Sequence, residues 1–163
     1  MSRAALTGAK RSSTPVAESW VSSRIVTAGC SATKAPMRPA KFDGEFTSAA
    51  IMKLVEQGRV KLDDDLSKYV PQFPLQGKKV SIRQLLNHTS GIHSYTSSRG
   101  WAKTWNDALS PDAIVKFVAA DTFDFAPGTA YRYNNTGYVL LGMVIEKASG
   151  QKYAKYLDAQ FFK

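Results

Sequence analysis

The chain has 163 residues and a formal net charge of +9, with 22 Lys and Arg residues against 13 Asp and Glu. Its length predicts one domain, and a hydrophobic fraction of 44% is enough for a packed core, which excludes a wholly disordered chain. The single cysteine, Cys30, excludes an internal disulfide framework and a cysteine-based zinc site. No run approaches the roughly 18 consecutive apolar residues of a transmembrane helix, so none is expected.

Most of the positive charge lies in the first quarter of the chain. Residues 1–41 contain seven basic residues and one acidic residue, whereas residues 42–163 contain fifteen basic and twelve acidic residues. Residues 1–41 are also rich in Ser, Ala, Thr, Arg and Pro, without helical or strand periodicity. We therefore expect a basic, largely disordered tail at 1–41 and a domain at 42–163. A solvated tail is favoured over a nucleic-acid-binding segment, so no nucleic-acid partner is expected.

The sequence of the tail does not predict a secretory signal, because such a signal needs an apolar segment of about 7–15 residues. Its best apolar pair, Ile25-Val26, is too short and follows Arg24, which also argues against a lipoprotein cleavage site at Cys30. The Arg- and Ser-rich, acid-poor composition fits an organelle transit peptide, and a third alternative is that these residues are not the domain's natural N-terminus. The compartment is left open.

The first predicted helix follows the tail. Apolar residues recur at helical spacing from Phe46 to Val55, and Gly58 is placed to end the helix. The three acids at 63–65 then precede Leu66. They raise the possibility of a metal site, but a cap for a short helix is favoured because no second ligand cluster is visible.

Four further helices are predicted along the chain. Residues 81–84 form a capping box ahead of a short helix, and Ser110-Pro111 marks another start. Residues 136–149 are almost continuously apolar, which predicts a helix buried nearly all round, with Gly150 as its stop. Residues 153–161 give a final amphipathic helix. The fold class is therefore mainly α, with long loops at about 88–109 and 121–135.

Two constellations could carry chemistry. Tyr133 and Asn135 lie two residues apart, just before the buried helix, where a proton shuttle and an amide donor could face one cleft. Ser90 lies close to His88, which suggests a nucleophile and its base. The Gly-x-Ser-x-Gly pattern is missing, however, and residues this close in sequence rarely reach the needed orientation, so a structural turn is favoured. His88 and His93 are too isolated to predict a metal site.

Residues 42–163 resemble the serine β-lactamase and penicillin-binding-protein superfamily, in particular the group of class C β-lactamases, D-alanyl-D-alanine carboxypeptidases and related esterases. Three blocks carry the resemblance, in the family's order: residues 46–58 continuing to 62–64; residues 85–92; and Pro127, Gly128, Tyr131, 133–135, Gly137, Tyr138, Leu141, Gly142, Ser149 and Gly150. The match covers the middle of a family member.

The resemblance implies a helical lobe of the α+β β-lactamase/transpeptidase-like fold, with the central sheet largely missing. It implies acyl transfer through a serine ester on a β-lactam, a D-Ala peptide of the peptidoglycan type or a small ester, with no cofactor and no metal. By the same resemblance, Tyr133 takes the general-base role and Asn135 contacts the substrate amide. Asn134 replaces the family's common Ser.

The catalytic ends of the family pattern are absent. In the family's register its Ser-x-x-Lys falls on Lys41 and Gly44, and no Lys-Thr-Gly or His-x-Gly follows. Other Ser-x-x-Lys strings are expected by chance. A tyrosine has an ordinary pKa near 10 and is a poor base at neutral pH without a neighbouring cation, which the family's Lys supplies.

We therefore expect a truncated or frame-disrupted member of the superfamily that is inactive alone. The alternative is a non-catalytic binding or regulatory module derived from this fold. Because little strand signal is available to cover the buried helix, we also expect exposed apolar surface and self-association.

Overall fold

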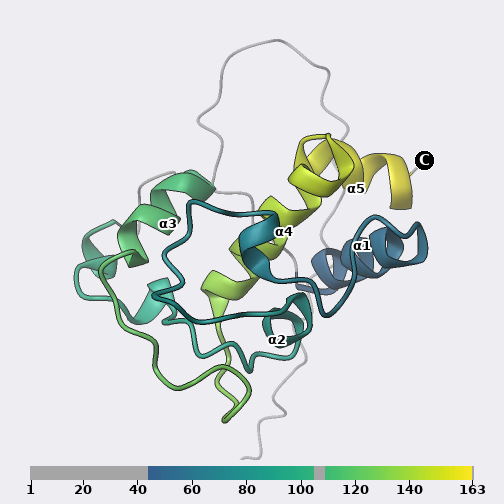
Figure 1. The fold of residues 1–163 in the computed structure, drawn as a ribbon. Coiled ribbons are helices and arrows are strands. Elements are labelled where there is room, and N and C mark those ends of the chain that lie inside the picture. Colours follow the sequence, from purple (N-terminus) through teal and green to yellow (C-terminus); the bar gives the residue numbers. More distant parts are fainter. Residues whose placement is uncertain (1–43, 105–108, 163) are drawn as a thin grey trace, which may run out of the picture. The chain divides into compact units, whose positions relative to one another are not determined.

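The structure is a computed structural model that describes residues 44–104 and 109–162 (Figure 1). The expected tail, residues 1–41, lies outside the described residues. Within the described ranges the secondary structure is helical and contains no β-strand. One isolated antiparallel bridge joins Asp65 to Ser81. The mainly α fold class is confirmed, and so is the lack of a central sheet for this part of the chain.

The described part of the chain contains five α-helices and three short 3-10 helices. In chain order they are α1 (Gly44–Glu56), η1 (Leu66–Lys68), α2 (Ile82–Leu86), η2 (Tyr95–Ser97), η3 (Trp101–Lys103), α3 (Pro111–Val118), α4 (Asn135–Ser149) and α5 (Tyr153–Phe161). All five predicted helices form. The loop expected at 88–109 contains two of the 3-10 turns.

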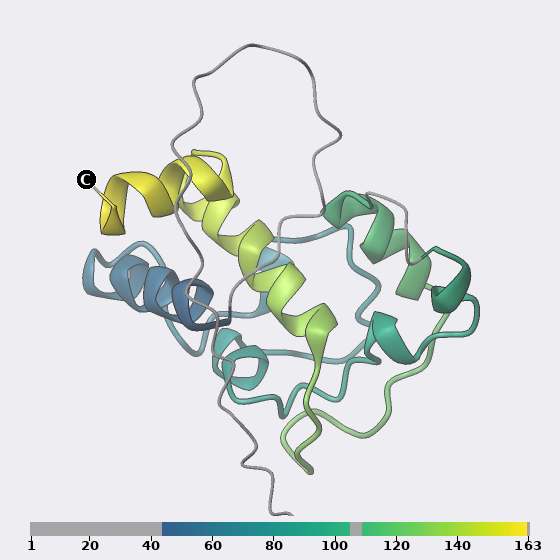
Figure 2. The same cartoon turned by 180° about the vertical axis from the view of Figure 1, so that it is seen from behind.

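Helix α4 is the element around which the others are arranged. It packs against α1, α2, α3 and α5. In two opposite views it runs between α3 on one side and the α1–α5 pair on the other (Figures 1 and 2). Nine of its 15 residues are buried, which agrees with the apolar run in the sequence. The N-terminus of α4 therefore has a fixed place in the fold, and the loop before it carries Tyr133.

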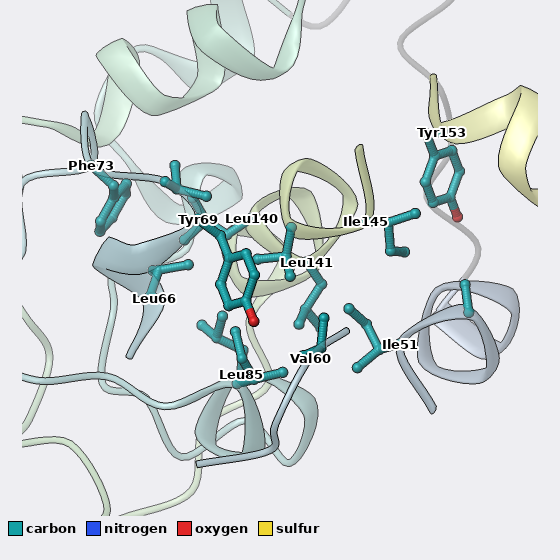
Figure 3. Close-up of a cluster of buried hydrophobic side chains, with 14 of the residues drawn as sticks. Ile51, Val60, Leu66, Tyr69, Phe73, Leu85, Leu140, Leu141, Ile145 and Tyr153 are labelled. Carbon is teal, nitrogen blue, oxygen red and sulfur yellow. The ribbon is translucent and has the colours of Figure 1, made fainter. Parts of the chain in front are cut away.

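The core fills the space between α4 and its neighbours. Side chains from α1, η1, α2 and α4 meet there (Figure 3). Ile51, Leu66, Leu140 and Ile145 are fully excluded from solvent. Burying an aliphatic side chain of this size stabilises a fold by about 1.5–3 kcal/mol, so this cluster is the main source of stability for the helical body.

The helix starts follow the capping chemistry read from the sequence. Asp65 accepts a hydrogen bond from the backbone of Ser67 and caps η1. Ser81 and Gln84 form both halves of the capping box of α2. Ser110 caps α3, whose first residue is Pro111. Each cap satisfies backbone N–H groups that the first turn leaves without partners.

The three acids at 63–65 have three different partners. The Asp63 carboxylate pairs with Arg83 at 3.0 Å, Asp64 accepts from the Tyr69 hydroxyl at 2.6 Å, and Asp65 is the cap described above. In residues 44–104 and 109–162, no group of three or more metal-binding side chains occurs. The cap at Asp65 confirms the capping interpretation for that residue, while Asp63 and Asp64 pair with other side chains.

Several large apolar side chains remain exposed. Met52 is 44% exposed on α1, and Phe162 is 61% exposed just after α5, where its ring contacts Phe46 at 5.1 Å between centroids. The expected self-association stays a prediction. Over the described ranges no helix is both long and apolar enough to span a bilayer.

Candidate functional site

Two irregular segments, residues 88–94 and 124–134, lie side by side and present Tyr133. Backbone bonds join them at three points: Asp124 N–H to Gly91 O (2.8 Å), Gly128 N–H to Thr89 O (2.8 Å) and Arg132 N–H to His88 O (3.0 Å). The loop that precedes α4 is thus held along much of its length by the loop that follows α2.

Tyr133 lies on this loop with its side chain open to solvent. The residue is 64% exposed, although its ring contacts the imidazole of His88 at 4.7 Å between centroids. Tyr131, 69% exposed, meets the same imidazole edge-on at 6.1 Å, and Tyr138 of α4 stacks on it at 5.1 Å. His88 is therefore the centre of an aromatic cluster formed with Tyr131, Tyr133 and Tyr138.

His88 has an unusual backbone and a defined hydrogen-bond role. Its φ is +60°, in the left-handed region that a non-glycine residue seldom adopts. Its Nδ1 accepts the backbone N–H of Asn134 at 3.2 Å, so a neutral ring carries its proton on Nε2. Partial burial lowers the pKa of His88 below its ordinary value. At neutral pH this imidazole is therefore an uncharged support for the Tyr133 ring.

Asn135 is the first residue of α4, one residue earlier than the sequence predicts for the helix start. Its backbone N–H donates to Ser94 Oγ at 3.3 Å, and its side-chain Nδ2 donates to Thr96 Oγ1 at the same distance. The side chain is partly buried against η2. The carboxamide of Asn135 has N–H donors on Nδ2 and an acceptor oxygen with which it can bind a ligand. The bond from Nδ2 to Thr96 fixes the orientation of this group.

Asn134 stands where the resemblance has a Ser, and its side chain makes two hydrogen bonds. Its Oδ1 accepts the backbone N–H of Gly137 at 3.0 Å and caps α4. Its Nδ2 donates to the carbonyl of Ile92 on the neighbouring loop. A serine could supply the cap but not reach across as a second donor, so the amide both begins the helix and ties the two loops together.

Ser90 and His88 do not form a nucleophile–base pair. Ser90 is 1% exposed, and its Oγ accepts the backbone N–H of Ile92 at 3.4 Å. His88 Nδ1 is occupied by Asn134, and within the described part of the chain no hydrogen bond joins the two side chains. The structural-turn interpretation of this segment is confirmed.

Gly44, the position that the resemblance assigns to the activating lysine, lies beside the aromatic cluster. A β-carbon placed on Gly44 would meet the Tyr138 ring at 3.5 Å, which is ordinary van der Waals contact. Ser48, one turn further along α1, lies 3.1 Å from the Tyr138 hydroxyl, which donates to Leu86 O. A side chain at position 44 would therefore start next to the Tyr138 ring, which stacks on His88. Lys41, the serine position, lies outside the described residues.

The sequence alone did not identify the ionic contacts at this site. Asp124 Oδ1 accepts from His93 Nδ1 at 2.7 Å, and its Oδ2 lies 3.0 Å from Arg132 Nη1. The three residues are up to 39 positions apart in sequence, and only the position of Arg132 next to Tyr133 could have drawn attention to them.

The surface also contains an open groove, which lies elsewhere. It has a volume of about 770 Å³ and is lined by residues of the 63–84 region, among them Asp63, Lys78 and Gln84. Tyr133 and Asn135 are not among its lining residues. The expectation that both face one cleft therefore rests on their positions in sequence and their partial exposure.

Comparisons with known proteins agree on one family. The sequence profile of the family described as Beta-lactamase matches residues 45–163. Penicillin-binding protein 4* of Bacillus subtilis is 39% identical over 129 residues, covering 76% of this chain and 27% of its own length. Protein flp of Staphylococcus aureus is 36% identical over 122 residues, covering 72% of this chain and 24% of that protein. The chain spans about a quarter of the length of these curated relatives.

Solved structures give the same result. A D-stereospecific amidohydrolase from Streptomyces matches with a TM-score of 0.67 and 34% identity, over 77% of this chain and 41% of that one. A D-amino acid amidase from Ochrobactrum anthropi matches with a TM-score of 0.64 and 30% identity, over 77% of this chain and 34% of that one. The family profile covers well over half of the chain, and the helical arrangement is shared, so the chain belongs to the Beta-lactamase family, as the sequence motifs predict.

Proposed function

We propose that the Tyr133 site is the helical part of a serine-hydrolase acyl-transfer site. Tyr133 is its general base and Asn135 its contact with the substrate amide. In the parent reaction a serine oxygen attacks the substrate carbonyl carbon, the base takes the serine proton, and the bond to the leaving group breaks as that group accepts a proton. Lys41 and Gly44 occupy the nucleophile and amine positions, so this chain alone forms no acyl-enzyme.

One observation carries this proposal: Tyr133 and Asn135 flank the N-terminus of the central helix, with an exposed phenol ring held from behind by an uncharged imidazole. A base must reach the proton it removes, and a 64% exposed hydroxyl-bearing ring is open to a substrate. The neighbouring amide of Asn135 can pair with a peptide group. Gly44, at the start of α1, has room for a side chain beside the ring of Tyr138, which stacks on His88.

The substrate class that we propose is an amide or ester of a D-configured acyl group, including β-lactams and D-Ala peptides. Two solved structures similar to this chain are described as a D-stereospecific amidohydrolase and a D-amino acid amidase. Both break amide bonds, which fits an asparagine carboxamide that can donate to a carbonyl and accept from an N–H. We further propose that residues 42–163 form the domain and that residues 1–41 are a tail apart from it.

The test uses the chain as it is. N-Acetyl-D-alanyl-D-alanine, titrated into isotopically labelled protein, is expected to shift amide resonances of 133–135 and Thr96 saturably. Asn135→Ala is expected to remove the shifts, while Gln76→Ala on the 70–80 loop retains them. In parallel, intact mass after incubation with a fluorescent penicillin is expected to show no adduct. A penicilloyl adduct on the unmodified chain, or shifts centred away from Tyr133, would contradict the proposal.

A second candidate, a non-catalytic binding module, is favoured by the residues at the two key positions, Lys41 and Gly44. A binding module is expected to bind the same substrate. The two candidates differ in the effect expected when the serine and the lysine are restored. A binding module that has lost its catalytic geometry would stay unreactive after a serine and a lysine are restored. A preserved acyl-transfer site would gain reactivity.

A further inference from the structure

The loop that carries Tyr133 is fixed by one well-shielded carboxylate. The Asp124 side chain is 13% exposed and has both of its oxygens engaged, one by His93 and one by Arg132. A carboxylate only accepts hydrogen bonds, so His93 Nδ1 carries the donated proton. Charge-assisted bonds of this kind are roughly twice as strong as neutral ones and hold their geometry closely.

The Arg132 contact fixes the residue before Tyr133. The guanidinium reaches back over the loop to Asp124, and the backbone N–H of Arg132 donates to His88 O at 3.0 Å. Arg132 is therefore held at both its side chain and its backbone. Because the next residue is Tyr133, the backbone from which its ring projects is held beside His88.

The His93 contact fixes the other side of Tyr133. The carbonyl of His93 accepts from Thr136 Oγ1 at 2.9 Å, and Thr136 is fully buried in the first turn of α4. The same hydroxyl accepts the backbone N–H of Tyr95 at 2.8 Å. Asp124 thus reaches residue 136 through His93 and residue 132 directly. The tyrosine and the asparagine of the proposed site lie between these two points.

The backbone at Asp124 is itself held in place. Its backbone N–H donates to Gly91 O at 2.8 Å, and a β-carbon placed on Gly91 would lie 2.1 Å from Phe125 O. Gly91 also has a φ of +71°. The two loops therefore pack so closely at Gly91 that only glycine fits there. This close packing restrains the backbone from which the Asp124 carboxylate projects.

We propose that Asp124 is a positioning residue for the Tyr133 site: by binding His93 and Arg132 together, it sets the position of the 132–136 segment. The role that it serves rests on the function proposed above, but the positioning itself does not. The residues between Pro127 and Tyr133 have no regular secondary structure, and two backbone bonds, from Gly128 and Arg132, join them to the neighbouring loop, so the ionic contacts add to a sparse set of restraints.

The first experiment measures positioning directly in the unmodified background. In Asp124→Asn, the carboxylate charge is lost and an amide N–H can face the guanidinium. Hydrogen exchange at the Arg132 and Asn134 amides is expected to accelerate on the order of tenfold, with α1 and α5 unchanged. Asp63→Asn is the matched control, because it removes another Asp–Arg pair outside these two loops. Unchanged exchange in Asp124→Asn, or equal acceleration in the control, would overturn the proposal.

A second variant guards against simple misfolding. Arg132→Gln removes only the Arg132 contact and leaves the Asp124–His93 pair, so it is expected to accelerate exchange at Arg132 but less than Asp124→Asn does. The double variant Asp124→Asn/Arg132→Gln is expected to add nothing to Asp124→Asn, because the carboxylate that Arg132 binds is already gone. Fully additive effects would overturn the proposal.

The link to chemistry is tested in a chain with Lys41→Ser and Gly44→Lys. There Asp124→Asn is expected to slow acylation by about 10²-fold while the protein still unfolds cooperatively, since misplacing a reacting group by about 1 Å costs that much in rate. An unchanged rate would overturn the role in positioning the base. A total lack of acylation in the parent variant would instead refute the proposed function, while the exchange experiment would still decide the role of Asp124.

Discussion

Two tyrosines on α5 allow a sharp test of the helical packing, because their hydroxyl groups have opposite surroundings. Tyr153 is 7% exposed, and its hydroxyl lies 2.7 Å from the hydroxyl of Thr47, a fully buried residue of α1. Tyr156 is 1% exposed, and no hydrogen-bond partner for its buried hydroxyl occurs within the part of the chain that the structure describes. The same substitution to phenylalanine should therefore have opposite effects.

The magnitudes follow from the cost of buried polar groups. Tyr153→Phe removes a buried bond and leaves the Thr47 hydroxyl without that partner, which should lower the free energy of unfolding by about 1–3 kcal/mol. Tyr156→Phe removes a hydroxyl that loses its hydration on folding without compensation, and it should raise the free energy of unfolding by about 1 kcal/mol. Burial also raises the pKa of Tyr156 above its ordinary value, as expected for a phenol withdrawn from water.

Urea unfolding followed by circular dichroism measures both changes, and differential scanning calorimetry checks them. For a domain of this size, about 1 kcal/mol corresponds to a shift of about 3–6 °C in the thermal midpoint. The midpoints of the two variants should lie on opposite sides of the parent protein. Equal destabilisation by both substitutions would refute the assignment of α5 to this face of α1. A non-cooperative transition in the parent would refute the packed core itself.

Three further predictions concern the site and the core. Asn134→Ala should lower the free energy of unfolding by about 1–2 kcal/mol through loss of the α4 cap, whereas Asn134→Ser should retain much of it, as denaturant titration can measure. Because burial lowers the pKa of His88, its contribution to stability should be complete above the ordinary value of 6.5 and diminish as pH falls below it, which unfolding midpoints between pH 7.5 and 5.5 would show. Hydrogen bonds from Tyr69, Lys68 and the Lys61 backbone lower the pKa of Asp64 to about 2. Asp64→Asn should therefore lower the free energy of unfolding by about 1–2 kcal/mol at pH 7. In the parent protein, this contribution to stability should disappear as pH falls from about 4 through 2.

Each of these predictions has an internal control. Equal losses in the serine and alanine variants of Asn134 would contradict its capping role. His88→Asn keeps a residue type that tolerates the left-handed backbone but cannot titrate, so an identical pH profile in that variant would exclude His88 as the cause. Asp63→Asn removes a neighbouring carboxylate that is exposed, and a loss as large as that of Asp64→Asn would mean that local charge, rather than the Tyr69 hydrogen bond, sets the effect.

The helices of this protein could be predicted because their signals are local. The capping box at Ser81 and Gln84 lies within four residues, and the apolar run of α4 ends at Gly150, whose φ of +72° requires a glycine-like residue. Such signals depend on backbone groups one turn apart. They determine where helices begin and end, and the structure reproduces them closely.

The details of the site could not be predicted in this way, because its partners are distant in sequence. Asn134 bonds to Ile92, and Asp124 to His93, across separations of 42 and 31 residues. Both loops lack periodicity, so nothing in the local pattern indicates their register against each other. His88 illustrates the same limit. The sequence predicts a turn at this residue, which is correct, but the place of His88 at the centre of three tyrosine rings depends on α4 and on the 131–133 segment.

We propose above that Tyr133 belongs to an acyl-transfer site that lacks a nucleophile and its amine. The most direct measurement is the intact mass of the Lys41→Ser/Gly44→Lys variant after hours with a fluorescent penicillin. Because the sequence has no Lys-Thr-Gly or His-x-Gly strand, each missing oxyanion donor should slow the reaction by about 10²–10³-fold, so hours are needed. One covalent adduct per chain is expected, and it should be lost when Tyr133→Phe is added. A folded double variant without any adduct, or an adduct that forms equally without Tyr133, would contradict the proposal.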